Sequence, residues 1–155
     1  MTQDFTWRDG ERLIRFAHGA VGEAPRLLAQ NGYHDYVLLT TDRARESVPD
    51  LVVRATTVVD VPPGRVDEIS ATLLKELDAD FGSLVAVGGG RVIDTTKAIA
   101  GAMGGHCAAI PTTLSGAELT SFHRLPAGVE GARMVRPGLI LACLLYTSPS
   151  PRDRS

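Results

Sequence analysis

Three consecutive glycines, Gly88 to Gly90, are the part of this sequence most suited to binding chemistry. The apolar run 83–87 precedes them and a helical pattern, 92–103, follows, so strand, glycine turn and helix succeed one another. Glycine has no Cβ, and the first amides of a helix lie at the positive end of its dipole. This order predicts a diphosphate site built from main-chain N–H groups.

The spacing of the glycines leaves a structural alternative open. The stretch from Gly88 to Asp94 is neither the usual dinucleotide fingerprint nor a P-loop, which would end in Gly-Lys-Ser or Gly-Lys-Thr. A tight turn that only lets strand and helix pack closely would also use glycine.

Charged residues follow in the first turns of the predicted helix. Arg91 is placed to reach a diphosphate directly. Asp94 favours the helix N-terminus with or without a ligand, so a cofactor contact and a structural role both stay open. Lys97 is expected to be solvated or to lie on the phosphate side. The predicted cofactor contacts of this motif are Gly88, Gly89, Gly90, Arg91 and Asp94.

A second polar cluster, 111–118, follows the next predicted strand, 107–110, and reads PTTLSGAE. Hydrogen-bonding side chains at the carboxyl end of a strand suit a ribose, amide or phosphate. The alternative is helix capping, because Ser115 and Glu118 fit the S-x-x-E capping box. The predicted cofactor contacts here are Thr112, Thr113 and Ser115.

Asp42 follows a third candidate strand, the apolar run 36–39. A carboxylate at this point accepts hydrogen bonds from an adenosine ribose and repels a 2′-phosphate, which would favour NAD over NADP. The alternative is that Asp42 caps a helix starting near Arg43.

The remaining patterns complete an α/β chain. Helices that alternate with short apolar strands predict a Rossmann-like parallel sheet flanked by helices on both faces. The further expected elements are an edge strand 12–18, helices 23–30, 43–48 and 66–77, a strand 55–59, and strands around 122–125 and 139–141.

Composition excludes several classes of protein. The formal net charge of -2 and pI near 6.1 give no basic surplus for nucleic acid or anionic lipid. No apolar run approaches the roughly 20 residues that span a bilayer, so we expect a cytoplasmic protein.

Two cysteines form no disulfide framework or zinc pattern, and Cys107 is expected in the core. The histidines show no metal-pair spacing, so none is assigned to a metal.

The composition of the C-terminal segment 143–155 changes abruptly to one rich in Ser, Pro and Arg, without periodicity. Its string CLLYTSPSPRD looks like a translated transposase adapter from sequencing libraries, so we expect a non-native tail after a domain 1–142. A natural disordered C-terminus is the alternative.

Two of these motifs together resemble a known family. The segments Gly88–Lys97 and Ile110–Thr120 look like the paired GGGxxxDxxK and PTTxxxxE motifs of the iron-containing alcohol dehydrogenase superfamily, which includes maleylacetate reductases and glycerol dehydrogenases. Thr41-Asp42 also matches. The resemblance covers essentially all residues before the tail, and it departs at Arg91, where many members have serine, and at His123-Arg124.

The resemblance implies the N-terminal domain of a dehydroquinate synthase-like fold, without the helical C-terminal domain that holds a divalent metal, Fe or Zn. It implies an NAD- or NADP-dependent oxidoreductase for a small alcohol or carbonyl substrate, and a homo-oligomer at full length. By similarity, Gly89, Gly90 and Arg91 contact the diphosphate, Thr112, Thr113 and Ser115 line the phosphate and nicotinamide side, and Asp42 meets the ribose.

One expectation and two alternatives follow for the chain as a whole. This chain alone is expected to have no turnover, and measurable NAD-dependent alcohol oxidation would refute that. An enzymatic alternative is a dehydroquinate synthase-like or glycerol-phosphate dehydrogenase-like protein, against which the 111–113 cluster and Glu118 argue. A nucleotide-binding module complete in itself is the non-enzymatic alternative.

Overall fold

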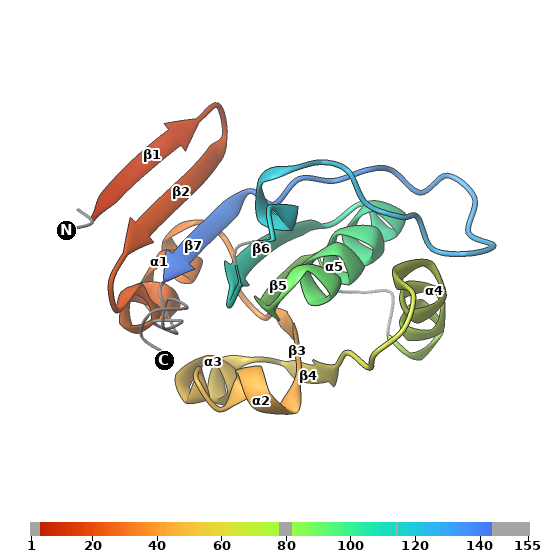
Figure 1. Ribbon diagram of the computed structural model, residues 1–155, viewed down its shortest axis with the longest axis horizontal. Coiled ribbons are helices and arrows are strands. Elements are labelled where there is room, and N and C mark those ends of the chain that lie inside the picture. The colour runs from red at the N-terminus through yellow and green to blue at the C-terminus, as the bar shows by residue number, and fades with distance from the viewer. Residues whose placement is uncertain (1–3, 78–81, 114, 144–155) are drawn as a thin grey trace, which may run out of the picture.

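Seven strands form one sheet in the order β1-β2-β7-β6-β5-β3-β4 (Figure 1). The computed structural model describes residues 4–77, 82–113 and 115–143. All neighbouring strands run parallel except the edge strand β1, which pairs antiparallel with β2. The strands are β1 Phe5–Asp9, β2 Arg12–Ala17, β3 Val37–Thr40, β4 Thr57–Asp60, β5 Ser83–Gly88, β6 His106–Pro111 and β7 Leu139–Cys143.

Helices cover both faces of the sheet because successive side chains of a strand point to opposite sides. In β5, Val85 and Val87 pack in a core with helices from one face, whereas Leu84 and Ala86 pack in a core with helices from the other. The first core takes α1 Ala24–Gln30, α2 Asp42–Arg45 and α3 Pro49–Arg54; the second takes α4 Val66–Glu76 and α5 Gly90–Met103. Short 3-10 helices, η1 Ala20–Glu23 and η2 Ala117–Leu119, complete the elements.

The α/β fold with a mostly parallel sheet is confirmed, as are the helices predicted at 23–30 and 66–77 and the strands at 36–39, 55–59, 83–87, 107–110 and 139–141. Cys107 is confirmed in the core, where burial raises the pKa of its thiol to about 12.

Three expectations about elements are wrong. Strand 12–18 is not an edge strand, because β2 lies between β1 and β7. The helix expected at 43–48 is present only as the shorter α2, which ends at Arg45, and a separate helix, α3, begins at Pro49. Residues 122–125 form no strand; they belong to an irregular connection, 120–138, between η2 and β7.

The connection 120–138 runs over α5 towards α4 before it returns to the sheet (Figure 1). The amide of Arg133 donates to the carbonyl of Gly101 in α5 at 3.1 Å, and Ala127 donates to Asp67 in α4 at 3.0 Å. A Cβ on Gly101 would collide with the carbonyl oxygen of Arg133. The glycine in the middle of this helix therefore permits the backbone to approach.

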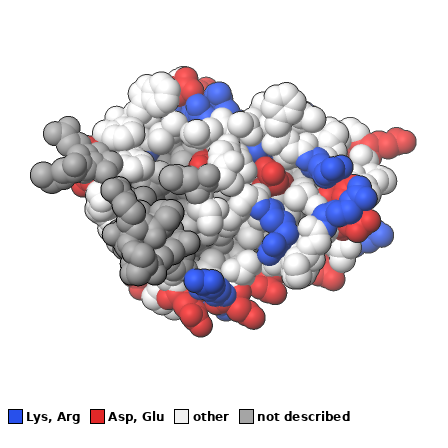
Figure 2. All heavy atoms as spheres, in the orientation of Figure 1, with Lys and Arg blue, Asp and Glu red and all other residues white. Residues whose placement is uncertain are grey.

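Most of the predicted tail, 144–155, lies outside the described residues. Strand β7 includes Cys143, whose backbone is in register with Ala17 of β2. Among the described helices, none combines the length and apolar character needed to cross a membrane. On the face seen in Figure 2, acidic and basic side chains are interspersed between larger neutral areas.

Candidate nucleotide-binding site

The carboxyl ends of β3, β5 and β6 meet at one edge of the sheet because these strands are parallel neighbours. The chain leaves β3 towards β4 on one side and leaves β5 towards β6 on the other, so the strand order reverses between β3 and β5. Open parallel sheets bind ligands in the crevice at such a reversal. The hydroxyl of Thr40, at the end of β3, donates to the carbonyl of Val87 in β5 at 2.8 Å and fixes the two ends together.

The glycine turn places the N-terminus of α5 at this crevice. Gly89 is the N-cap and, as a glycine, has no side chain of its own to cap the helix. The first main-chain bond of the helix runs from Ile93 to the carbonyl of Gly89 at 3.1 Å, so the amides of Gly90, Arg91 and Val92 precede it. Gly89, Gly90 and Arg91 are half-buried, so the turn is not sealed from solvent.

The two polar clusters that the sequence places about 25 residues apart lie against each other here. A Cβ on Gly89 would lie 3.3 Å from the hydroxyl oxygen of Thr113, and one on Gly90 would lie 3.1 Å from that of Ser115. The β5–β6 pairing brings them together, because Gly88 faces Pro111 and the next amide, Thr112, donates to the Gly88 carbonyl at 2.9 Å.

Ser115 also supports the local backbone, although not as a capping box. Its hydroxyl accepts from the amide of Ala117 at 3.2 Å and donates to the carboxylate of Glu118 at 3.4 Å. Gly116, with a φ of +86°, is the N-cap of the short helix η2. Ser115 and Glu118 therefore have a structural role, but they stabilise one turn and do not form the expected capping box. Ser115 remains exposed beside Gly90.

Lys97 is not solvated, which was one of the two positions expected from the sequence, but is completely buried. Its ammonium donates to the carbonyl oxygens of Ala117 at 2.7 Å and Phe122 at 3.0 Å. It also pairs with the carboxylate of Asp94 at 3.1 Å. Lysine is buried only when its charge is compensated in this way. The i,i+3 spacing of Asp94 and Lys97 was the signal in the sequence for this pair.

Asp94 and Arg91 therefore differ in how free they are to meet a ligand. The carboxylate of Asp94 is engaged by Lys97 and is 30% exposed. The Nε of Arg91 is buried and has no hydrogen-bond acceptor among the described residues. A buried donor without an acceptor is costly, which fits a position that an anion completes.

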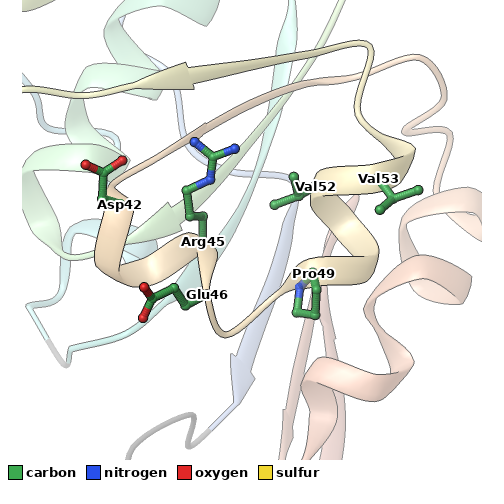
Figure 3. A pocket seen from close by; sticks show the side chains of 6 residues that line it. All are labelled: Asp42, Arg45, Glu46, Pro49, Val52 and Val53. Atoms are coloured by element: carbon green, nitrogen blue, oxygen red, sulfur yellow. The ribbon is translucent and has the colours of Figure 1, made fainter.

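Asp42 does not cap α2, because Thr41 takes that role. The hydroxyl of Thr41 accepts from the amide of Ala44 at 3.1 Å, and Asp42 is the first residue of the helix with an exposed side chain. An open hollow of about 500 Å³ lies beside Asp42, over α2 and α3 (Figure 3). Its other lining residues are Arg45, Glu46, Pro49, Val52 and Val53.

Within the described part of the chain, no group of three or more His, Cys, Asp or Glu side chains could hold a metal ion. His123 instead serves the connection 120–138: its Nε2 accepts from the amide of Val135 at 2.8 Å, and its Nδ1 lies 3.0 Å from the carbonyl of Arg124. Acceptance at Nε2 leaves the ring proton on Nδ1, which donates to that carbonyl.

Comparison with known proteins finds one matching family model, described as iron-containing alcohol dehydrogenase, over residues 15–123. A search of curated protein sequences found no match. Similar solved structures include maleylacetate reductase from Agrobacterium tumefaciens, with 22% identity, a TM-score of 0.69, and coverage of 91% of this chain and 43% of that one.

Two further solved structures share the fold. Sulfoacetaldehyde reductase from Bifidobacterium kashiwanohense, in complex with NAD+, is 22% identical with a TM-score of 0.67, over 88% of this chain and 46% of that one. Glycerol dehydrogenase from Schizosaccharomyces pombe is 21% identical with a TM-score of 0.64, over 83% and 36%. This chain therefore spans less than half the length of these solved structures.

Proposed function

Since this chain belongs to the iron-containing alcohol dehydrogenase family, we propose that it is the nucleotide-binding part of a dehydrogenase that transfers hydride between a nicotinamide and a small alcohol or carbonyl compound. NAD or NADP, when bound, supplies the hydride acceptor or donor. The residues of this chain bind and orient that cofactor.

One observation carries the proposal: half-buried glycines bring the first amides of α5 beside two side-chain hydroxyls at the point where the strand order reverses. A diphosphate is anionic and accepts hydrogen bonds, and main-chain amides at the positive end of α5 complement both properties. Thr113 and Ser115 add hydroxyl donors beside Gly89 and Gly90. The guanidinium of Arg91, whose Nε has no acceptor among the described residues, adds a cation within the same turn.

The remaining contacts of the cofactor follow from the same frame. We place the adenosine ribose at Asp42 and the adenine in the hollow beside it, where Pro49 and Val52 offer apolar walls. Thr112 lies on the phosphate and nicotinamide side. In this proposal Gly88 acts mainly by shaping the backbone turn. Asp94 acts mainly through its ion pair with Lys97.

The metal that the family name implies finds no fitting group of ligands among the described residues. In this proposal the metal site and the substrate contacts belong to other parts of a longer enzyme. This chain is then expected to bind the cofactor without turning over an alcohol.

The test is a calorimetric titration of the full chain with NAD+ and NADP+, repeated on three variants. Gly90→Ala places a Cβ 3.1 Å from the Ser115 side chain and covers the amides, so NAD+ should bind about tenfold more weakly. Asp42→Asn removes the charge that repels a 2′-phosphate, so the preference for NAD+ over NADP+ should shrink. Gly22→Ala is the matched control, because a Cβ there meets nothing within 4 Å.

The proposal fails if folded wild-type chain binds neither cofactor, or if Gly90→Ala and Gly22→Ala bind NAD+ equally well. Circular dichroism of each variant establishes that weaker binding does not reflect unfolding.

A further inference from the structure

The segment 115–122 brings Ser115 to the candidate site, although apolar burial anchors little of it. Leu119 is 50% exposed and Phe122 is 78% exposed. The other side chains of the segment are small or polar, and among them Glu118 alone is fully buried. The position of the segment therefore depends mainly on hydrogen bonds to its main chain.

Two buried cations hold this segment from two sides. Lys97 in α5 donates to the carbonyls of Ala117 and Phe122. Arg12, the first residue of β2, donates from Nη1 to the carbonyl of Leu119 at 2.9 Å. Figure 1 shows η2 between the β1–β2 hairpin and α5, which are the elements that carry the two cations. The main chain of the segment is therefore fixed between these elements.

The ion pair within the hairpin does not explain why Arg12 is buried. Its side chain is 9% exposed, and its Nη2 pairs with the carboxylate of Asp9 at 2.6 Å. Asp9 is itself 39% exposed, so this pair does not require a buried guanidinium. The Nε of Arg12 is also buried and has no acceptor among the described residues, which adds to the cost of desolvation. Burial of Arg12 therefore serves the contact with Leu119.

The position of Ser115 follows that of η2 through adjacent contacts. The amide of Leu119 donates to the carbonyl of Gly116 at 3.0 Å, and the amide of Ala117 donates to the hydroxyl of Ser115 at 3.2 Å. A Cβ on Gly90 would lie 3.1 Å from this same hydroxyl oxygen. A displacement of η2 therefore moves the hydroxyl that we place beside the diphosphate of the cofactor.

We propose that Arg12 is a positioning residue for cofactor binding, which holds η2 through the carbonyl of Leu119 and so keeps Ser115 beside Gly90. The inference rests on the proposed nucleotide-binding function. Arg12 lies outside the residues 15–123 that match the family model, and it is 107 residues from Leu119 in the sequence. Its contact couples the β1–β2 hairpin to the glycine turn.

The test compares Arg12→Met with Asp9→Asn, because both substitutions break the same ion pair and only the first removes the donor to Leu119. In a calorimetric titration, Arg12→Met should bind NAD+ about fivefold more weakly than wild type, as the loss of one positioning hydrogen bond predicts. Asp9→Asn should bind NAD+ within about twofold of wild type. Arg12→Lys keeps a cationic donor and should recover most of the affinity.

The route through Ser115 predicts that two substitutions are not additive. Ser115→Ala alone removes the hydroxyl donor and should weaken NAD+ binding about fivefold. Independent losses would multiply to about 25-fold, whereas the double variant Arg12→Met/Ser115→Ala should lose less than about tenfold. The reason is that Arg12 then has no hydroxyl to position. A general loosening of the fold would not produce this coupling.

A measurement without cofactor follows the same contact directly. Amide hydrogen exchange of the segment 116–122 should be faster in Arg12→Met than in Asp9→Asn, because only the first substitution releases η2. Arg12→Gln, whose side chain is too short to reach Leu119 in the same way, repeats both comparisons if the methionine variant does not fold.

The outcomes separate this inference from the proposed function. If folded Arg12→Met binds NAD+ as tightly as wild type, or Asp9→Asn binds it as weakly as Arg12→Met, the inference is overturned and the proposed function stands. Equal exchange of the segment 116–122 in the two variants overturns the inference as well. A folded wild-type chain that binds no NAD+ overturns the proposed function, and this inference with it.

Discussion

Adjacent glycines in the turn at the start of α5 have different neighbours. A Cβ on Gly88 would lie 2.8 Å from a methyl group of Val92, so this glycine lets β5 and α5 pack closely. Gly89 and Gly90 instead face the hydroxyls of Thr113 and Ser115. The alternative of a tight turn that only lets strand and helix pack closely therefore describes Gly88. The nucleotide proposal depends on Gly89 and Gly90.

Lys97 shows that a charged residue of a binding motif can act from inside the protein. Its ammonium joins α5 to the carbonyls of Ala117 and Phe122 and so fixes the segment that follows Thr113 and Ser115. Lys97→Met keeps the length of the side chain but leaves these buried acceptors and the Asp94 carboxylate without their donor. We expect a loss of about 2–4 kcal/mol in the free energy of unfolding, measured with urea.

Lys75 provides the control for this prediction, since it is the other lysine of the chain and is exposed on α4. Lys75→Met should change the free energy of unfolding by less than about 0.5 kcal/mol. Equal effects of the two substitutions would contradict the role assigned to Lys97.

At the scale of elements, the sequence predicts the helices and strands that are determined by a local pattern of apolar residues. The apolar spacing of Ile69 and Leu73 predicts α4, and the unbroken apolar run in β5 predicts a strand buried on both faces. Strand β1 escapes prediction because its two faces are both exposed, so no burial pattern marks it. Gly101 escapes for another reason: its purpose is a backbone contact with Arg133, about 30 residues away, which no local pattern encodes.

The irregular connection 120–138 depends on an uncharged histidine. Burial lowers the pKa of His123, and its Nε2 accepts from the amide of Val135 only while unprotonated. The unfolded chain therefore binds this proton more readily than the folded one, so the contribution of His123 is complete above about pH 6.5 and is lost as the pH falls below that value. His106, whose pKa burial also lowers, acts with the same sign.

We therefore expect the free energy of unfolding to decrease from pH 7 to pH 5, measured with urea at several pH values. His123→Gln keeps an acceptor for Val135 without a titrating ring, so its stability should depend less on pH over this interval. A His106→Gln variant serves as comparison, because it removes the other imidazole whose pKa is lowered by burial and leaves the connection 120–138 intact. An unchanged slope in His123→Gln would contradict the prediction.

At the scale of the whole molecule, the candidate site exists only when the sheet is assembled. Asp42, the glycine turn and Ser115 follow three different strands, and they share one edge through the pairing of β3, β5 and β6. Sequence motifs predicted each group separately, and parallel order predicted that they would meet. The contacts of Thr40 and Lys97 that hold the groups in place depend on side-chain packing between distant segments, which the sequence does not display.

Because the site requires the assembled sheet, cofactor binding should stabilise the entire fold. A ligand that binds only the folded state raises the free energy of unfolding by about 2.7 kcal/mol when present at 100 times its dissociation constant. We expect NAD+ to raise the thermal midpoint of the wild-type chain and of Gly22→Ala alike, in proportion to the logarithm of its concentration. Gly90→Ala should need about tenfold more NAD+ for the same rise. If NAD+ shifts the midpoint of Gly90→Ala as much as that of wild type, the cofactor stabilises the protein at some place other than the glycine turn.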